Sequence, residues 1–395
     1  MNQYRGFMFR LIIITGGAIF AMFFGAGNLV FPLDIGVKSG IHVNVAIIGF
    51  FLSGILIPLL GLYAISLYHG NYMHFFSHLG RIPGFIVSCL VILLIGLVVG
   101  TPRCGLLSYN TFLPLFPILK SHRIVFNALF FSGVYLVSLK QNRVVDALGW
   151  VLSPLKLSVL FILIILGVAV KHHPLLTVTS LAPIKTFQHA IEAGYSTMDL
   201  LAGIFFCAFV HRSIRYKLAK KNGLNTDRIE RRLTLYACLV GAMLLTLVYS
   251  FFILIANYHA FNLQGVPTQK LIGTLALLLL HEAGGIFVSI CVGLACFSTA
   301  IAVTAITVEF IHTHILNHKI NYRVVLLCVV CIVFTLSTLG FERLMNIAIP
   351  ILNILYPALL GLTIGNVLYK LKDWNVGPIF FLIGLCVPFT IMSFS

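Results

Sequence analysis

Long apolar runs decide what this chain can fold into. Runs of about 17 to 25 residues cross the hydrocarbon core of a bilayer as helices, and we predict about eleven of them. Their approximate bounds are 10–33, 43–67, 83–112, 124–139, 149–170, 188–211, 233–256, 284–311, 323–340, 345–369 and 377–394. Of 395 residues, 60% are hydrophobic and only 9% are charged, whereas soluble domains carry roughly 25% charged residues. The sequence therefore predicts an all-α polytopic membrane protein.

The formal net charge of +16 does not indicate nucleic-acid binding, because the basic residues lie in short loops between the apolar runs. Lys and Arg in such loops mark the cytoplasmic side of a membrane. Their distribution favours a cytoplasmic N-terminus. The nine cysteines are scattered, mostly within apolar runs, where a free thiol behaves as a small hydrophobe. We expect no resident cofactor, and the sequence leaves the oligomeric state open.

The first apolar run contains residues that interrupt a helix. The stretch Phe20–Pro32 reads FAMFFGAGNLVFP, and Gly25, Gly27 and Asn28 all lower helix propensity at bilayer depth. Unwound backbone inside a membrane lines a cavity or is covered by protein, and in transporters it marks the substrate and ion site. Close packing of small residues is the alternative. With Ala26, the two glycines let a ligand approach the backbone, and Asn28 can offer its amide to an ion or a carboxylate.

A second interruption falls in the sixth run, where Glu192–Asp199 reads EAGYSTMD. We place Tyr195, Ser196 and Thr197 among the substrate-binding residues of this break. Asp199 is costly within a span and marks a ligand contact or a pathway; capping of the following half-helix is the competing role. Breaks five helices apart indicate two five-helix repeats of inverted topology with the site between them. This pattern favours an alternating-access carrier.

Broken helices present free N–H groups to an anion and free carbonyls to a cation, so a zwitterionic amino acid suits both ends. In the eighth run, the hydroxyls of Ser298 and Thr299 and the carbonyl of Ala295 are hard oxygen ligands that suit Na⁺. Hydroxyls of this kind also bond back to their own helix. Both interpretations stay open at this point.

Two basic residues lie inside apolar runs. Arg103 follows Pro102, which kinks a helix; it could pair with Asp199, line an outer vestibule, or extend to the headgroups. Lys156 lies near the start of the fifth run and could also extend to the membrane surface. Alternatively, its ammonium occupies or neighbours a cation site, which would favour proton coupling.

One segment is too short to span. The stretch Asn257–Gly285 is expected to be an external loop, in which Leu271–Leu280 forms a short amphipathic helix.

Six stretches, spread from the first helix to the tenth, resemble the branched-chain amino acid:cation symporters (LIVCS family, BrnQ type), which share the LeuT fold. They are Phe20–Pro32, Gly49–Gly61, Thr101–Tyr109 (TPRCGLLSY), Gly194–Ala202 (GYSTMDLLA), Cys296–Phe310 and Ile349–Pro357 (IPILNILYP). The resemblance implies uptake of leucine, isoleucine and valine across a bacterial cytoplasmic (inner) membrane, driven by Na⁺. A proton-coupled carrier of the same fold for another small or aromatic amino acid is the alternative.

The resemblance also assigns roles to residues. A sodium site is implied at the backbone of Ala21, Phe24 and Ala295 with the hydroxyls of Ser298 and Thr299. Asn28, Thr197 and Asp199 are implied to lie near the substrate amine or a further cation. The implied architecture is a LeuT-like 5+5 inverted repeat with broken helices 1 and 6. Its ten-helix core covers 1–375, with repeats at about 10–170 and 188–369, and 376–395 forms an extra helix.

Overall fold

Helices make up all of the regular structure in residues 2–139, 182–222 and 227–393, the ranges that the computed structural model describes. In chain order they are α1 (Asn2–Phe23), α2 (Ala26–Ser39), α3 (Val43–Phe51), α4 (Ile57–Leu67), α5 (Tyr72–Phe76), α6 (Arg81–Leu93), α7 (Gly100–Phe112), α8 (Arg123–Ser138), α11 (Pro183–Ser196), α12 (Asp199–Asn222), α13 (Asp227–Tyr258), α14 (Ala260–Leu263), α15 (Leu271–Phe310), α16 (Tyr322–Ser337), α17 (Phe341–Lys372) and α18 (Gly377–Ser393). Two π-helical turns, η2 (Leu52–Leu56) and η4 (Leu94–Val98), join α3 to α4 and lead from α6 toward α7.

Within these ranges, 6 segments are long and apolar enough to cross a membrane. They are Gly6–Phe23, Ala26–Leu67, Arg81–Phe112, Ile229–Tyr258, Gly284–Ile315 and Phe341–Lys372. Shorter apolar helical stretches lie at Arg123–Ser138, Thr268–Leu280, Tyr322–Ser337 and Gly377–Cys386, the second of which includes the first part of α15. The chain is therefore an all-helical polytopic membrane protein. The predicted span 149–170 and its Lys156 lie outside the described residues.

The expected external helix at Leu271–Leu280 does not exist as a separate element, and that prediction was wrong. Instead, α15 runs without a break from Leu271 to Phe310 over 40 residues. The pair Gly284-Gly285 in its interior does not end the helix, because a glycine costs only about 1 kcal/mol relative to alanine there.

Close backbone contacts join α2 to α13. A Cβ atom at Gly36 would lie 2.3 Å from the carbonyl oxygen of Ile253, so only glycine permits this approach. The buried Asn257 of α13 donates its side-chain amide to the carbonyls of Gly36 and Gly40, at 3.2 and 2.9 Å. It thereby supplies a donor to carbonyls at the C-terminal end of α2, where the hydroxyl of Ser39 also donates to the carbonyl of Gly36 at 3.0 Å. These contacts fix α2 against α13.

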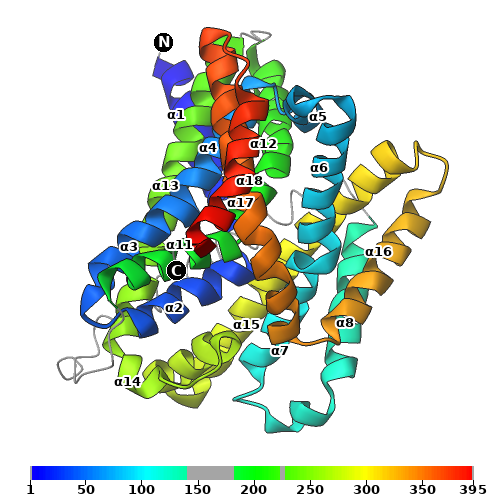
Figure 1. Cartoon of the computed structure of the whole chain (residues 1–395). Coiled ribbons are helices and arrows are strands. Elements are labelled where there is room, and N and C mark those ends of the chain that lie inside the picture. The colour runs from blue at the N-terminus through cyan, green and yellow to red at the C-terminus, as the bar shows by residue number, and fades with distance from the viewer. Residues whose placement is uncertain (1, 140–181, 223–226, 394–395) are drawn as a thin grey trace.

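The last two helices form a tightly packed pair, which Figure 1 shows in orange and red. A Cβ atom at Gly361 would lie 2.1 Å from the carbonyl oxygen of Phe380, and one at Gly384 would lie 2.3 Å from that of Pro357. Small residues allow this approach between membrane helices. Thus α18, predicted as an extra helix, packs directly on α17.

Short non-helical segments separate α1 from α2 and α11 from α12. Residues Phe24 and Gly25 lie in the first segment, and Thr197 and Met198 lie in the second. Helix α11 contacts α2, α3 and α17, while α12 packs on α4 and α7 packs on α15 (Figure 1). This arrangement brings the two non-helical segments together.

Candidate functional site

The break between α1 and α2 is closed by one side chain. The N–H of Gly25 donates to Oδ1 of Asn28 at 3.4 Å, in place of the carbonyl that a continuous helix would supply. Gly25 has extended backbone, with φ −118° and ψ −161°. As a result, α2 begins at Ala26 with its N-terminal N–H groups at the break, where they favour a negative charge.

The break between α11 and α12 contains a strained residue. Met198 has φ +65°, a left-handed conformation that costs energy for a residue with a side chain. The preceding Thr197 stabilises the turn: its hydroxyl donates to the carbonyl of Gly194 at 2.7 Å and accepts the N–H of Asp199 at 3.4 Å. Helix α12 begins directly after this turn, with Asp199 as its first residue.

Asn28 connects the two breaks. Its amide nitrogen donates to Oδ2 of Asp199 at 2.5 Å and also to the hydroxyl of Tyr249 on α13. All three side chains are buried, with at most 3% of their surface exposed. Tyr249 is held in turn by Phe50, whose ring lies edge-on at 5.3 Å between ring centroids. The Asp199 carboxylate is therefore fixed by an uncharged donor on α2.

The guanidinium of Arg103, a residue of α7, lies at the C-terminal end of α11. Its Nη1 donates to the carbonyl of Ser196 at 2.6 Å and its Nη2 to the carbonyl of Thr197 at 3.3 Å. The guanidinium stacks over the ring of Phe31 at 5.5 Å, and a Cβ atom at Gly27 would lie 2.7 Å from Nη2. Arg103 is only 4% exposed. The suggestion that it extends to the headgroups was therefore wrong, because buried carbonyls and an aromatic ring hold it.

A pocket lies between the two breaks. Polar groups in its wall come from both of them, with Arg103 added from α7 and Thr299 from α15. Apart from Met198, the residues at the breaks that line it are Gly25, Ala26, Gly27, Asn28, Thr197 and Asp199. The rest of the wall is largely apolar, including Met22, Phe23, Ile95, Met198, Ala202, Phe206 and Val303. About 40 Å³ is open to the centres of water molecules, room for a few waters.

Of the two hydroxyls proposed for a cation, that of Thr299 lies beside the first break. Those of Ser298 and Thr299 both donate to the carbonyl of Ala295, at 2.8 and 3.1 Å, so each hydroxyl has its proton directed away and oxygen lone pairs remaining. A Cβ atom at Gly25 would lie 2.9 Å from Oγ1 of Thr299. At the end of α1, Phe24 donates its N–H to the carbonyl of Phe20 at 2.8 Å. One oxygen atom of α15, Oγ1 of Thr299, thus lies beside Gly25, which follows the end of α1, the helix that carries Ala21.

Comparison with known proteins identifies the family. Residues 9–390 match the family model described as "Branched-chain amino acid transport protein". The chain belongs to this family. It is a family of transporters and not of enzymes. The chain is also 30% identical over 368 residues to the branched-chain amino acid permease BrnQ of Corynebacterium glutamicum, covering 92% of this chain and 83% of that permease.

Solved structures show the same fold in other transporters. A nucleobase-cation-symport-1 family transporter, closed with bromovinylhydantoin bound, matches with a TM-score of 0.65 and 11% identity over 97% of this chain and 92% of that one. MhsT in complex with L-phenylalanine matches with a TM-score of 0.60 and 16% identity over 93% of this chain and 97% of that one. This member of the branched-chain transport family therefore has the fold of the LeuT-fold transporters.

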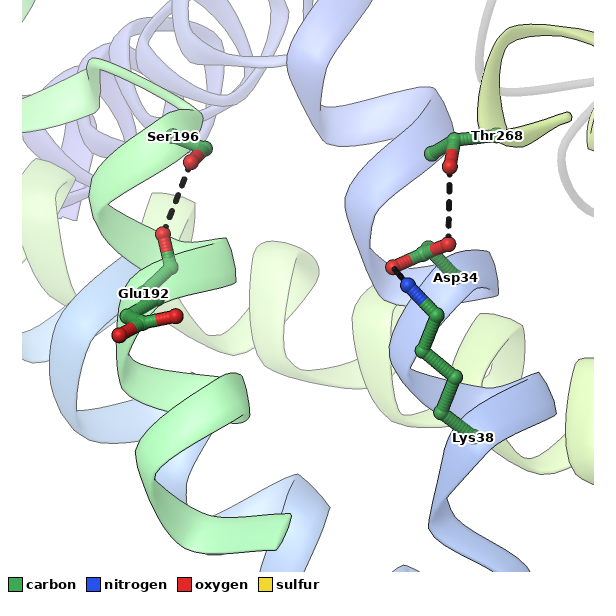
Figure 2. Close-up of polar contacts among 5 residues, drawn as sticks. All are labelled: Asp34, Lys38, Glu192, Ser196 and Thr268. Atoms are coloured by element: carbon green, nitrogen blue, oxygen red, sulfur yellow. Dashed lines mark hydrogen bonds and ion pairs between the residues drawn. The ribbon is translucent and has the colours of Figure 1, made fainter. Parts of the chain in front are cut away.

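Two predicted substrate residues of the transporter lie outside the pocket wall. Tyr195 stacks on Tyr356 of α17, with ring centroids 4.4 Å apart. The hydroxyl of Ser196 donates to the carbonyl of Glu192 in its own helix at 2.9 Å, as Figure 2 shows. Ser196 contributes to the site through its backbone carbonyl, which accepts a hydrogen bond from Arg103.

Figure 2 also shows a second group of polar contacts, on α2. Asp34 accepts from Nζ of Lys38 at 2.7 Å and from the hydroxyl of Thr268 at 2.9 Å. The bond to Thr268 ties the segment before α15 to α2. These side chains are absent from the wall of the pocket, so Asp34 and Asp199 have different surroundings.

Sequence reasoning missed two tyrosines of the transporter. Tyr249 accepts from Asn28, and the hydroxyl of Tyr356 accepts the N–H of Leu200 at 3.0 Å, in the first turn of α12. Both are at most 1% exposed. The available signal was a phenolic hydroxyl within an apolar run, where it needs a hydrogen-bond partner. For Tyr356, the stretch IPILNILYP already carried the family resemblance.

Proposed function

We propose that this transporter imports leucine, isoleucine and valine by symport with a cation, with Na⁺ as the coupling ion. This proposal rests mainly on a pocket at two helix breaks that presents a cationic group and a carboxylate within a largely apolar wall. Membership of the branched-chain amino acid transport family and similarity to BrnQ support this substrate class.

The charges suit an α-amino acid. The N-terminus of α2 carries a partial positive charge, and Nη2 of Arg103 lies beside Gly27 in its first turn. Two positive groups at one place favour an anion between or beside them. We assign the substrate carboxylate to this side and the ammonium to Asp199, whose carboxylate lines the same pocket. Asn28 keeps Asp199 in position.

The apolar wall suits an aliphatic side chain. Met22, Ile95, Phe206 and Val303 come from α1, η4, α12 and α15. One methylene group in an apolar pocket separates ligands by only about 1–3 kcal/mol. Leucine, isoleucine and valine are therefore expected to compete for this site.

The cation is assigned to the break between α1 and α2. Its ligands are the hydroxyl oxygens of Ser298 and Thr299 and the backbone of Ala21, Phe24 and Ala295. Support comes from the short approach of Thr299 to Gly25 and from the bonds that leave both hydroxyl oxygens as acceptors. Similarity to a cation symporter is consistent with an ion at this fold's helix breaks.

We further propose that α1/α2 and α11/α12 are the broken helices 1 and 6 of a 5+5 inverted repeat. The pocket has about 40 Å³ open to the centres of water molecules, so a branched side chain enters only when the lining helices separate. Separation on one side of the membrane, followed by closure and separation on the other, moves the amino acid and the cation together.

Uptake of labelled leucine into proteoliposomes tests this function. The purified full-length chain is given an imposed Na⁺ gradient, or separately a pH gradient without Na⁺. We expect Na⁺-dependent uptake that unlabelled isoleucine and valine inhibit and that phenylalanine inhibits weakly. Uptake driven by the pH gradient alone would replace Na⁺ with H⁺. Absence of leucine uptake under both gradients would exclude the proposed function.

A further inference from the structure

The four backbone carbonyls from Gly194 to Thr197, at the C-terminal end of α11, each have a protein donor. The carbonyl of Gly194 accepts the N–H and the hydroxyl of Thr197, at 3.2 and 2.7 Å, and that of Tyr195 accepts the N–H of Met198 at 3.0 Å. The carbonyls of Ser196 and Thr197 accept from Arg103. Carbonyls at a helix C-terminus carry partial negative charge and favour a cation. Here the cation is a side chain of the protein.

Arg103 is a permanent charge in this position. A guanidinium remains protonated in proteins, and this one is held by two carbonyls and the ring of Phe31. It is 4% exposed. Such a group can neither dissociate into water nor release a proton during transport, unlike a bound ion.

The break between α1 and α2 differs. At Gly25, the side chains that reach the backbone are the amide of Asn28 and the hydroxyl of Thr299, which are neutral. Within the described residues, Arg103 is the only Lys or Arg in the pocket wall. The hydrogen bonds of this fixed positive charge go to the carbonyls of the second break, although Nη2 also lies beside Gly27 in the first turn of α2.

We propose that Arg103 occupies the position of a second coupling cation, so that one exchangeable cation accompanies each amino acid. This inference rests on the proposed function and concerns its stoichiometry. The α11/α12 break is neutralised by Arg103 and Asp199, which the chain keeps through the cycle. The exchangeable cation binds at the α1/α2 break, beside Ser298 and Thr299.

The test is the number of charges moved with each leucine. Proteoliposomes with wild-type protein are set at a series of membrane potentials against an opposing leucine gradient, and the potential at which net labelled-leucine flux is zero gives the ratio. Leucine is a zwitterion without net charge, so we expect one positive charge per leucine and a cation-concentration dependence with a Hill coefficient near one.

Two variants separate the role of Arg103 from general damage. Arg103→Lys keeps a positive charge, and we expect the ratio to stay at one. Arg103→Gln removes it, and we expect slower uptake with the ratio and the Hill coefficient rising toward two, because a dissolved cation then takes the carbonyls of Ser196 and Thr197.

Several outcomes overturn the inference. A wild-type ratio of two does so even if Arg103→Gln fails to fold, and so does an Arg103→Gln variant with wild-type uptake and a ratio of one. Either result leaves the proposed transport of leucine standing. Absence of leucine uptake by the wild type under any cation gradient would instead remove the proposed function itself.

Discussion

The break between α1 and α2 and the break between α11 and α12 each leave two residues outside a helix, yet different chemistry closes them. At the first, an uncharged side chain three residues ahead, Asn28, accepts the free N–H of Gly25. At the second, a guanidinium from another helix takes the free carbonyls. A neutral side chain therefore closes the first break, while a permanently charged one closes the second.

The same two breaks are locked to each other by Asn28 and Asp199. They are also in contact at Gly27 and Thr197, where a Cβ atom at Gly27 would lie 3.1 Å from the Thr197 Cα atom. The comparison suggests four substitutions, which test the carboxylate, the close contact, the cation ligands and the supporting tyrosine.

Asp199→Asn should have the largest effect. It removes the charge assigned to the substrate ammonium, and a hydrogen bond to a charged group contributes about 1.5–3 kcal/mol. We expect the initial rate of leucine uptake at low substrate to fall about 10- to 100-fold. The matched control is Asp34→Asn, because Asp34 lies on α2 but does not line the pocket. Its ion pair with Lys38 is worth less than about 1 kcal/mol, so leucine uptake should change little. Unchanged uptake in Asp199→Asn would remove this carboxylate from the mechanism.

Gly27→Ala tests the contact between the breaks. The added methyl would lie 2.7 Å from Nη2 of Arg103 and 3.1 Å from backbone of Thr197, and overpacking of this kind costs roughly 1–3 kcal/mol. We expect the leucine KM to rise about 5- to 100-fold. Gly17→Ala is the control, because a Cβ atom there meets nothing within 4 Å. An unchanged KM would mean that the breaks separate before leucine binds.

The double variant Ser298→Ala/Thr299→Ala tests the first break as the cation site. Each hydroxyl is assigned about 0.5–1.5 kcal/mol, so the Na⁺ concentration for half-maximal uptake should rise about tenfold. Thr246→Ala serves as the control, since its hydroxyl also donates to its own helix, to Ala242 at 2.8 Å. Equal Na⁺ dependence in both variants would place the cation elsewhere.

Tyr249→Phe should have the smallest effect. It removes one neutral acceptor of the Asn28 amide, worth about 0.5–1.5 kcal/mol, and we expect uptake to fall about 2- to 10-fold. Tyr258→Phe, on the same helix but at a residue that is 62% exposed, should leave leucine uptake unchanged. A loss as large as that of Asp199→Asn would indicate that Tyr249 contacts the substrate directly.

Much of the architecture could be predicted from the sequence, because each residue pays its own cost of entering a bilayer and membrane-spanning helices therefore appear as apolar runs. The weak helix at Gly25 and Gly27 could be predicted in the same way, because helix propensity also depends on the residue itself. Continuity of α15 through Gly284 could not be predicted, because two glycines within a long helix cost less than its packing gains. The side of the membrane that holds the N-terminus remains a prediction.

The sequence by itself determined that a carboxylate, Asp199, lies at membrane depth beside a helix break, because the interrupting residues and Asp199 are neighbours within one apolar run. Only the tertiary structure decided what each charge meets. Arg103 had three plausible destinations, and its partners at Ser196 and Thr197 are 93 and 94 positions away in the chain. Asn28 meets Asp199 across 171 positions. Such pairs depend on how whole helices pack, which no local pattern records.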